Sequence, residues 1–203
     1  MAGFRRLAIA AAFAGLFAFG CGGAAHSSGA SVAQNELTGS AFGQPFVPAD
    51  TLLVHPQSWK SAAAGSTAIL VSDTTNLCAQ ITAGKTTAPG RLVVVSLQRN
   101  GADGKVVDLD VGQYAKDGQG TPSSRYGELF LSGVDAQCAF EKSSASDRSS
   151  IHVTSVGPGS TQVSVTVDVH FASGDELQGS ISASTGCDEA AVDQYLNSSA
   201  KCG

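Results

Sequence analysis

The 203-residue chain has few charged side chains, and basic ones are especially scarce. Charged residues make up 14% of the sequence, with 12 Lys and Arg against 17 Asp and Glu. Two of the arginines are Arg5 and Arg6, and without them 10 basic residues face 17 acidic ones, a formal charge of −7. Nucleic-acid binding and electrostatic attachment to anionic lipid both need basic surface, so we expect no nucleic-acid partner.

The sequence also lacks the compact motifs of common enzymes. It has no Gly-x-Ser-x-Gly elbow for a nucleophilic serine, no His-Glu-x-x-His, and no pair of cysteines at zinc-knuckle spacing. Residues 79–86 (AQITAGKT) match a loose P-loop pattern, but Pro89-Gly90 follows where that motif needs a helix. We therefore expect no metal and no cofactor, and we favour a protein that is not an enzyme.

No apolar run at the N-terminus is long enough to span a membrane. Leu7–Phe19 has 13 residues, whereas a spanning helix needs roughly 20. The run follows Arg5 and Arg6 and precedes small residues, which is the pattern of a secretory signal. The sequence therefore predicts a signal peptide over residues 1–20 and export from the cytosol.

The end of this signal, Ala18-Phe19-Gly20-Cys21, resembles a bacterial lipobox. Gly20 and Cys21 fit that pattern, whereas Ala18 stands where leucine is usual and Phe19 where a small residue is usual. The resemblance implies that Cys21 is lipidated, becomes the mature N-terminus and attaches the protein to a membrane through its acyl chains. Ordinary cleavage after residues 23–25 is the alternative, and it would discard Cys21.

The residues after Cys21 predict a tether and one domain. Residues 22–34 (GGAAHSSGASVAQ) have no apolar periodicity, and a flexible chain of that length reaches roughly 20 Å. We interpret residues 21–34 as the lipidated cysteine with its tether and residues 35–203 as a single β domain, since no internal repeat or second domain is evident.

Alternation of apolar and polar residues is clearest near the C-terminus. Residues 161–171 (TQVSVTVDVHF) place every second residue on an apolar face, and alternation resumes after a turn at residues 173–175. With the preceding strand that starts at Ile151, residues 151–184 predict a three-stranded meander. The buried face favours a register that pairs Phe171 with Leu177, Val169 with Gly179 and Val167 with Ile181.

Further strands and two short helices complete the predicted fold. The other predicted strands are Leu37–Phe46, Thr51–His55, Thr67–Ser72, Arg91–Arg99, Lys105–Tyr114 and Arg125–Leu131. The continuous apolar run Leu92–Val95 indicates a strand covered on both faces. The predicted helices are Thr75–Ile81, with polar capping residues before it and Gly84 to stop it, and Asp188–Asn197. The fold class is therefore mainly β, an antiparallel β-sandwich or partly open barrel of about nine short strands.

Five cysteines leave one without a partner inside the chain, and Cys21 is the odd one. Cys78, Cys138, Cys187 and Cys202 allow three pairings into two disulfides. We favour Cys187 with Cys202, which would fasten the chain end, and consequently Cys78 with Cys138.

A few scattered residues are candidates for binding or catalysis. Trp59, the only tryptophan, could stack on a sugar together with Tyr114 or Tyr126, but we favour its burial at one end of the sandwich. Asp103, Asp108 and Asp110 lie near a predicted turn and could bind calcium. Their spacing is not that of a calcium-binding helix-loop-helix, so we favour a solvated turn.

Of the four histidines, His152 and His170 are predicted to be solvated. His152 and His170 fall on the polar faces of their strands, His26 lies in the tether, and His55 precedes Pro56. None has an evident partner for catalysis.

The segment Ser149–Gly186 also resembles the C-terminal part of small, uncharacterised bacterial lipoproteins with a β-sandwich domain. It carries the pattern Phe171-x-x-Gly174-x-x-Leu177-x-Gly179-Ser180, and Cys187 comes one residue later than in those proteins. The resemblance implies a fold and no activity. We predict an envelope lipoprotein with a non-catalytic β domain whose partner is an envelope protein or a glycan. Because Gly22 is not an acidic retention signal, the outer membrane is favoured. The alternative is an envelope carbohydrate-binding protein or a hydrolase that uses Asp108, Asp110 and His152.

Overall fold

Antiparallel strands dominate the computed structural model, which describes residues 35–55, 66–85, 89–145 and 149–197. These residues belong to one compact unit, 33–203. The predicted signal peptide, Cys21 and the predicted tether lie outside the described residues. In the part of the chain that is described, no helix is both long and apolar enough to cross a membrane.

The first sheet has six strands in the order β2-β1-β12-β11-β10-β7. Their bounds are β1 Thr38–Ala41, β2 Gln44–Pro45, β7 Gly112–Tyr114, β10 Ser150–Val156, β11 Gln162–His170 and β12 Glu176–Ser184. The strands β10, β11 and β12 form the predicted three-stranded meander, which is confirmed.

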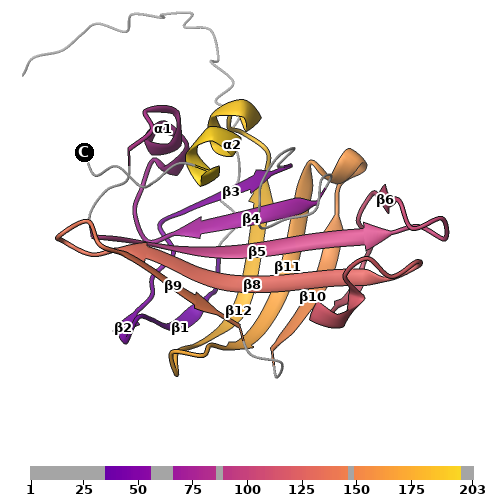
Figure 1. Ribbon diagram of the computed structural model, residues 1–203, viewed down its shortest axis with the longest axis horizontal. Helices are drawn as coiled ribbons and strands as arrows, with labels where there is room; N and C mark the ends of the chain where they lie inside the picture. The colour runs from indigo at the N-terminus through magenta and orange to yellow at the C-terminus, as the bar shows by residue number, and fades with distance from the viewer. Residues whose placement is uncertain (1–34, 56–65, 86–88, 146–148, 198–203) are drawn as a thin grey trace, which may run out of the picture. The chain divides into compact units, whose positions relative to one another are not determined.

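The second sheet has the order β3-β4-β5-β8-β9, and β6 pairs with β5 beside this path. Its strands are β3 Asp50–Val54, β4 Thr67–Ser72, β5 Gly90–Asn100, β6 Val106–Val107, β8 Arg125–Val134 and β9 Phe140–Ser144. In Figure 1 the long strands β5 and β8 cross in front of β10, β11 and β12 at a steep angle.

The main hydrophobic core lies between the two sheets. Alternate residues of β11, from Val163 to Val169, face alternate residues of β5 and β8 such as Val95 and Leu129, and all of these are buried. Burial of one such side chain contributes about 1.5–3 kcal/mol, so the alternation that predicts the strands also supplies the force that closes the sheets. The predicted β-sandwich class is confirmed, and the two sheets do not close into a barrel.

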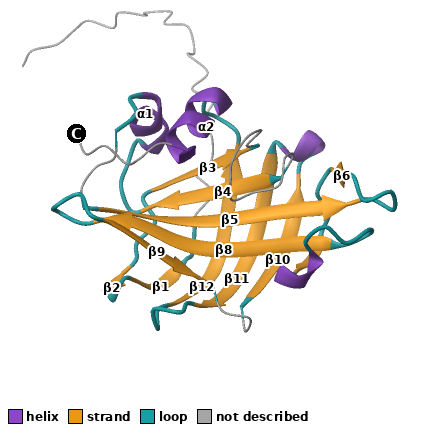
Figure 2. Ribbon diagram, viewed as in Figure 1, coloured by secondary structure: helices purple, strands orange, loops and turns teal. Residues whose placement is uncertain are grey.

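Two helices cover the opposite face of the second sheet. These are α1 Leu77–Thr82 and α2 Glu189–Asn197, which lie side by side near β3 and β4 (Figure 2). Ile81 and Val192 pack on Leu70 and Val94 in a second buried cluster. The strand β5 is therefore covered on both faces, as the apolar run predicts, and both predicted helices are confirmed.

The start of α1 corrects a detail of the helix prediction. Asn76 has a left-handed backbone (φ 59°) and makes no side-chain cap. Instead, the Leu77 N–H donates to a carboxylate oxygen of Asp50 at 2.7 Å, and Asp50 also accepts from the Thr51 N–H at 2.8 Å. The helix is thus capped by a residue from β3, which no local pattern could indicate.

The predicted register between β11 and β12 is wrong by two residues. Leu177 pairs with Val169 rather than Phe171, and Gly179 pairs with Val167. Phe171 closes the turn instead, because its N–H donates to the Asp175 carbonyl at 2.9 Å and Gly174 has a left-handed backbone (φ 88°). A shift of two residues keeps the same face buried, so the hydrophobic pattern alone could not separate the two registers.

Two predicted strands are each divided in the structure, and one strand was not predicted. Lys105–Tyr114 contains β6 and β7, which belong to different sheets, and Leu37–Phe46 contains β1 and β2 around a turn at Phe42 and Gly43. The strand β9 lies in a segment with little apolar alternation, and it forms by pairing with β8.

The predicted disulfide pairing is also wrong. Cys78 is bonded to Cys187, with Cα atoms 5.5 Å apart, so neither Cys78–Cys138 nor Cys187–Cys202 forms. The cause is the packing of α1 against the start of α2 on one sheet face, which brings together residues 109 positions apart. Cys138 is disulfide-bonded, and Cys202 lies outside the described residues.

Candidate functional site

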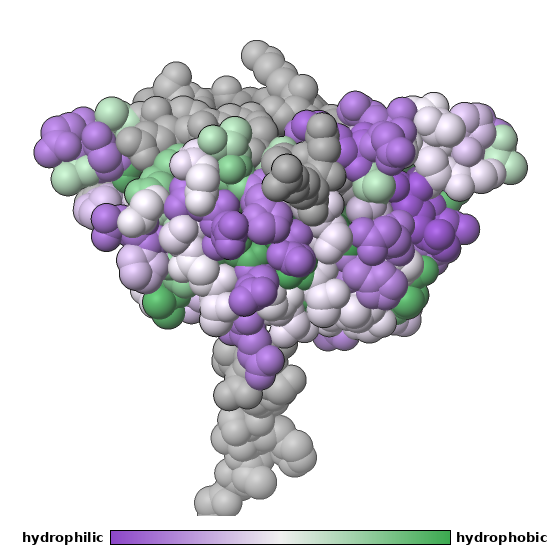
Figure 3. Space-filling view, turned by 90° about the horizontal axis from the view of Figure 1, so that it is seen from below, coloured by the Kyte–Doolittle hydropathy of each residue, from purple (hydrophilic) through white to green (hydrophobic). Residues whose placement is uncertain are grey.

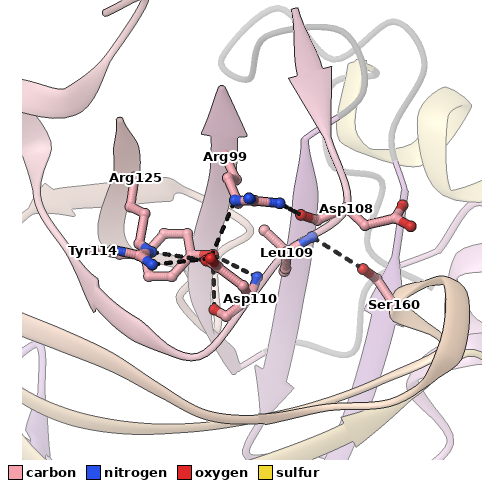
Figure 4. A network of polar contacts seen from close by, with 7 residues as sticks. All are labelled: Arg99, Asp108, Leu109, Asp110, Tyr114, Arg125 and Ser160. Atoms are coloured by element: carbon pink, nitrogen blue, oxygen red, sulfur yellow. Dashed lines mark hydrogen bonds and ion pairs between the residues drawn. The ribbon is translucent and has the colours of Figure 1, made fainter. Parts of the chain in front are cut away.

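A network of polar contacts surrounds Asp110, in the segment between β6 and β7 (Figure 4). Arg125, at the start of β8, donates to both carboxylate oxygens of Asp110 at 2.7 and 2.9 Å. The Arg99 Nε lies 3.2 Å from the same carboxylate. The Tyr114 hydroxyl donates to the Asp110 carbonyl at 3.0 Å and accepts from the Asp110 N–H at 3.2 Å.

These contacts fix the protonation of Asp110. The hydrogen bonds from Arg125 lower the pKa of Asp110 below its usual range, against a smaller opposing effect of burial, and the charge of Arg99 lowers it further. A carboxylate held ionised between two guanidinium groups is a poor proton donor and is not free to act as a base.

The cluster instead fastens the segment that crosses from one sheet to the other. The Leu109 N–H donates to the Ser160 Oγ at 3.4 Å, and the Leu109 side chain is buried in the main core. Arg99 also donates to the Asp108 carbonyl at 2.9 Å. We therefore interpret Asp110 as an anchor of the β6–β7 connection.

The remaining predicted acidic and histidine candidates do not converge. Asp103 lies 3.6 Å from the Lys105 ammonium at the surface. His152 is exposed on β10, and no described residue hydrogen-bonds to its side chain. Within the described ranges, no group of three or more His, Cys, Asp or Glu side chains could hold a metal ion.

Two other histidines pair with carboxylates. His170 Nδ1 lies 2.9 Å from Glu176 Oε1 on the exposed face of the first sheet. His55 Nδ1 lies 3.2 Å from Glu189 Oε1, which links β3 to α2. Both are surface contacts of a kind that contributes at most about 1 kcal/mol, and His26 lies outside the described residues.

The two tyrosines that were candidates for stacking on a sugar are buried. Tyr114 is 1% exposed and Tyr126 is 4% exposed, so neither presents a ring face to solvent. The Tyr126 hydroxyl donates to Glu128 at 2.6 Å, and burial together with this carboxylate raises the pKa of Tyr126. Trp59 lies outside the described residues.

Sequence reasoning missed a pocket of about 310 Å³ where the two sheets meet beside η1 (Lys116–Gly118). Its lining includes Tyr114, Lys116, Asp117, Glu128, Leu129 and Ser149. The lining combines apolar side chains with charged residues of both signs. The lining residues come from β7, η1, β8 and β10, so no local motif could have indicated the pocket.

A second pocket, of about 370 Å³, lies at the other end of β8. Its charged lining residues are Arg91, Asp73 and Asp135. The Arg91 Nε donates to Asp73 at 2.6 Å, and its Nη1 donates to the carbonyls of Ala41 and Gln44. The guanidinium also lies 5.7 Å from the centre of the Phe46 ring. The hydrogen bonds of Arg91 therefore stabilise the β1–β2 turn.

No described residue hydrogen-bonds to the buried Ser66 Oγ, Ser96 Oγ or Gln98 Oε1. Ser96 and Gln98 lie two residues apart on β5, and Ser96 pairs with Ala68, which is two residues after Ser66. Each such atom carries a desolvation cost of about 1–3 kcal/mol.

The surface of the described residues offers no broad apolar area on the face seen in Figure 3, where hydrophobic residues occur in small groups among hydrophilic ones. Within the described ranges, the exposed large hydrophobic side chains are Val47, Val107 and Val111. No known protein family, curated protein or solved structure matches this chain.

Proposed function

We propose that this protein is a lipid-anchored lipoprotein of the bacterial cell envelope, with the outer membrane favoured. Its β domain has a non-catalytic role, binding or supporting an envelope protein or glycan. The observation that carries the proposal is the disulfide between Cys78 and Cys187. Structural disulfides persist in oxidising compartments and are rare in the cytosol, which agrees with the export signal in residues 1–20.

Two further observations support a binding role over catalysis. Asp110 is neutralised by Arg125 and Arg99, and His152 stands apart from it on an exposed strand face. The pocket beside η1 has the size and the mixed lining that ligand sites use, near the lower end of their usual range of about 300–1,000 Å³.

The anchor can be tested by substituting Cys21. The wild-type protein, expressed in bacteria fed an alkyne-bearing palmitate, should incorporate the label and sediment with membranes. Cys21→Ser should lose both properties, because a thioether to the lipid cannot form. Intact-mass spectrometry should show the acyl mass on a mature chain that begins at residue 21.

Cys187→Ser is the matched control, because it removes a cysteine outside the signal. This variant should keep the label. Labelling that persists in Cys21→Ser, or a mature wild-type chain that begins after residue 25, would refute the lipid anchor.

A further inference from the structure

The disulfide between Cys78 and Cys187 skips Cys138, which lies between them in the sequence and is itself disulfide-bonded. Because the Cys78–Cys187 bond uses two of the five cysteines, Cys138 can pair within the chain only with Cys21 or Cys202. The proposed acylation of Cys21 leaves Cys202, which lies outside the described residues. The two disulfides of the chain are then interleaved, and neither joins cysteines that are consecutive in the sequence.

The order in which the cysteines leave the cytosol favours a different pairing. A chain exported behind an N-terminal signal brings out Cys78 and Cys138 while Cys187, about 50 residues further on, is still inside. Loop length adds a small preference for this early pair, since a loop of 109 residues closes about two- to threefold less readily than one of about 60. Early oxidation therefore joins Cys78 to Cys138 and leaves Cys187 to join Cys202.

The native pair, in contrast, depends on the completed fold. Cys78 and Cys187 are partly buried against the second hydrophobic cluster, in which Ile81 of α1 and Val192 of α2 are buried. Because α2 is the last described element of the chain, this cluster cannot assemble until the strands before it have been exported. Cys138 is exposed in the turn after β8, so its sulfur is in reach of an early oxidant.

A chain with both consecutive pairs cannot correct itself. Once these pairs have formed and Cys21 is acylated, no cysteine of the chain retains a thiol with which to start an exchange. We propose that this protein is a substrate of a thiol–disulfide isomerase of the envelope, a partner that supplies a reactive thiolate. This inference rests on the proposed export of the protein and on the acylation of Cys21.

The exchange takes three steps and consumes no oxidant or reductant. The thiolate of the partner attacks the Cys138 sulfur, which forms a mixed disulfide and releases the Cys78 thiolate. That thiolate attacks the Cys187 sulfur, which forms the native Cys78–Cys187 bond and releases the Cys202 thiolate. The Cys202 thiolate then attacks Cys138 in the mixed disulfide, which forms the second native disulfide and returns the thiolate of the partner.

The test compares the wild-type, full-length protein in bacteria with and without their envelope disulfide isomerase. After free thiols are blocked by acid quenching and alkylation, trypsin separates the four distal cysteines, because a lysine lies between each consecutive pair. Peptide mapping without reduction should recover mainly Cys78 linked to Cys187 when the isomerase is present. Without it, this fraction should fall about threefold or more, since random pairing of four cysteines gives each of three connectivities equally. Cys78 linked to Cys138 should take its place.

The double variant Cys138→Ala/Cys202→Ala is the matched control, because it leaves Cys78 no competing partner. It should form the Cys78–Cys187 bond to the same extent in both strains. Reduced glutathione, added to the mispaired wild-type protein in detergent, should supply the missing thiolate and convert the protein to the native pairing.

The possible outcomes separate this inference from the lipid anchor. Complete native pairing of the wild type without the isomerase would overturn the inference and leave the anchor untouched. An equal loss of Cys78–Cys187 in the control variant would do the same, because competing thiols would not then be the cause. Fully reduced cysteines in both strains would refute export, and a Cys21–Cys138 linkage would refute the acylation of Cys21 together with the inference.

Discussion

At the scale of single residues, buried or partly buried carboxylates accept hydrogen bonds that join separate segments of this domain. Asp175, in the turn between β11 and β12, is 4% exposed. It accepts hydrogen bonds from the Ser40 hydroxyl at 2.6 Å, the Gly43 N–H at 2.8 Å and the Ser173 hydroxyl at 2.7 Å. It therefore joins its own turn to the β1–β2 turn, where Phe42 holds a left-handed backbone (φ 52°) that a bulky residue rarely adopts.

Replacement of Asp175 by asparagine should lower the free energy of unfolding by about 1–2 kcal/mol, because charge-assisted hydrogen bonds become neutral ones. Urea denaturation at neutral pH measures this difference. Asp168→Asn is the control, because that side chain is exposed on β11, and it should change stability by less than about 0.5 kcal/mol. Equal unfolding free energies of the two variants would show that the hydrogen bonds of Asp175 do not stabilise the β1–β2 and β11–β12 turns.

The same residue should contribute to the pH dependence of stability. Burial raises the pKa of Asp175, but hydrogen bonds from Ser40, Ser173 and Gly43 together outweigh it, so the pKa lies below its usual value. Its contribution is then fully present above the unfolded pKa of about 4 and is lost as the pH falls through the folded pKa. Unfolding free energies measured from pH 7 down to pH 2 should fall less steeply for Asp175→Asn than for the wild type. Parallel curves would contradict this assignment.

At the scale of elements, the periodicity of the sequence predicts which strand faces are buried. It does not predict features that depend on how strands pair. The alternation in β11 and the apolar run in β5 correctly indicate which faces are buried. The pairing of Leu177 with Val169 depends on the geometry of the turn, and the strand β9 depends on its pairing with β8. Neither cause produces a local sequence pattern. The pocket beside η1 was missed for the same reason, because four separate elements contribute to it.

The strands β1 and β12 can lie close together because two glycines at their contact have no side chains. Gly179 has φ 137°, and a Cβ atom there would lie 1.9 Å from the Glu36 carbonyl oxygen. Gly39 has φ 133°, and its Cβ would lie 2.0 Å from the Glu176 carbonyl oxygen. The two strands therefore approach more closely than any other residue would allow.

Gly179→Ala should destabilise the domain by about 3 kcal/mol or more, since backbone strain and a backbone clash add together. Gly186→Ala is a suitable control, because a Cβ there meets no atom within 4 Å. Urea denaturation, together with the yield of folded protein, compares the two. A Gly179→Ala protein within about 1 kcal/mol of the wild type would mean that the strands separate easily at this point.

At the scale of the whole domain, covalent and backbone links join parts that lie far apart in the sequence. The Cys78–Cys187 disulfide spans 109 residues, and single bridges join Leu53 to Thr185 and Ala145 to Phe171. The sequence predicts that cysteines are oxidised, but it could not predict which ones pair. That choice depends on α1 and α2 covering the same face of the second sheet.

The disulfide should supply a large share of the stability of the domain. Because it closes a loop of about a hundred residues, the double variant Cys78→Ala/Cys187→Ala should lose about 3–5 kcal/mol of unfolding free energy in the chain-entropy estimate. Each single variant should lose nearly as much as the double one, since removal of either sulfur opens the same loop. Peptide mapping without reduction should recover residues 78 and 187 in one cross-linked fragment. Recovery of Cys78 linked to Cys138, or a double variant within about 1 kcal/mol of the wild type in urea, would show that the two helices are held on the sheet by packing alone.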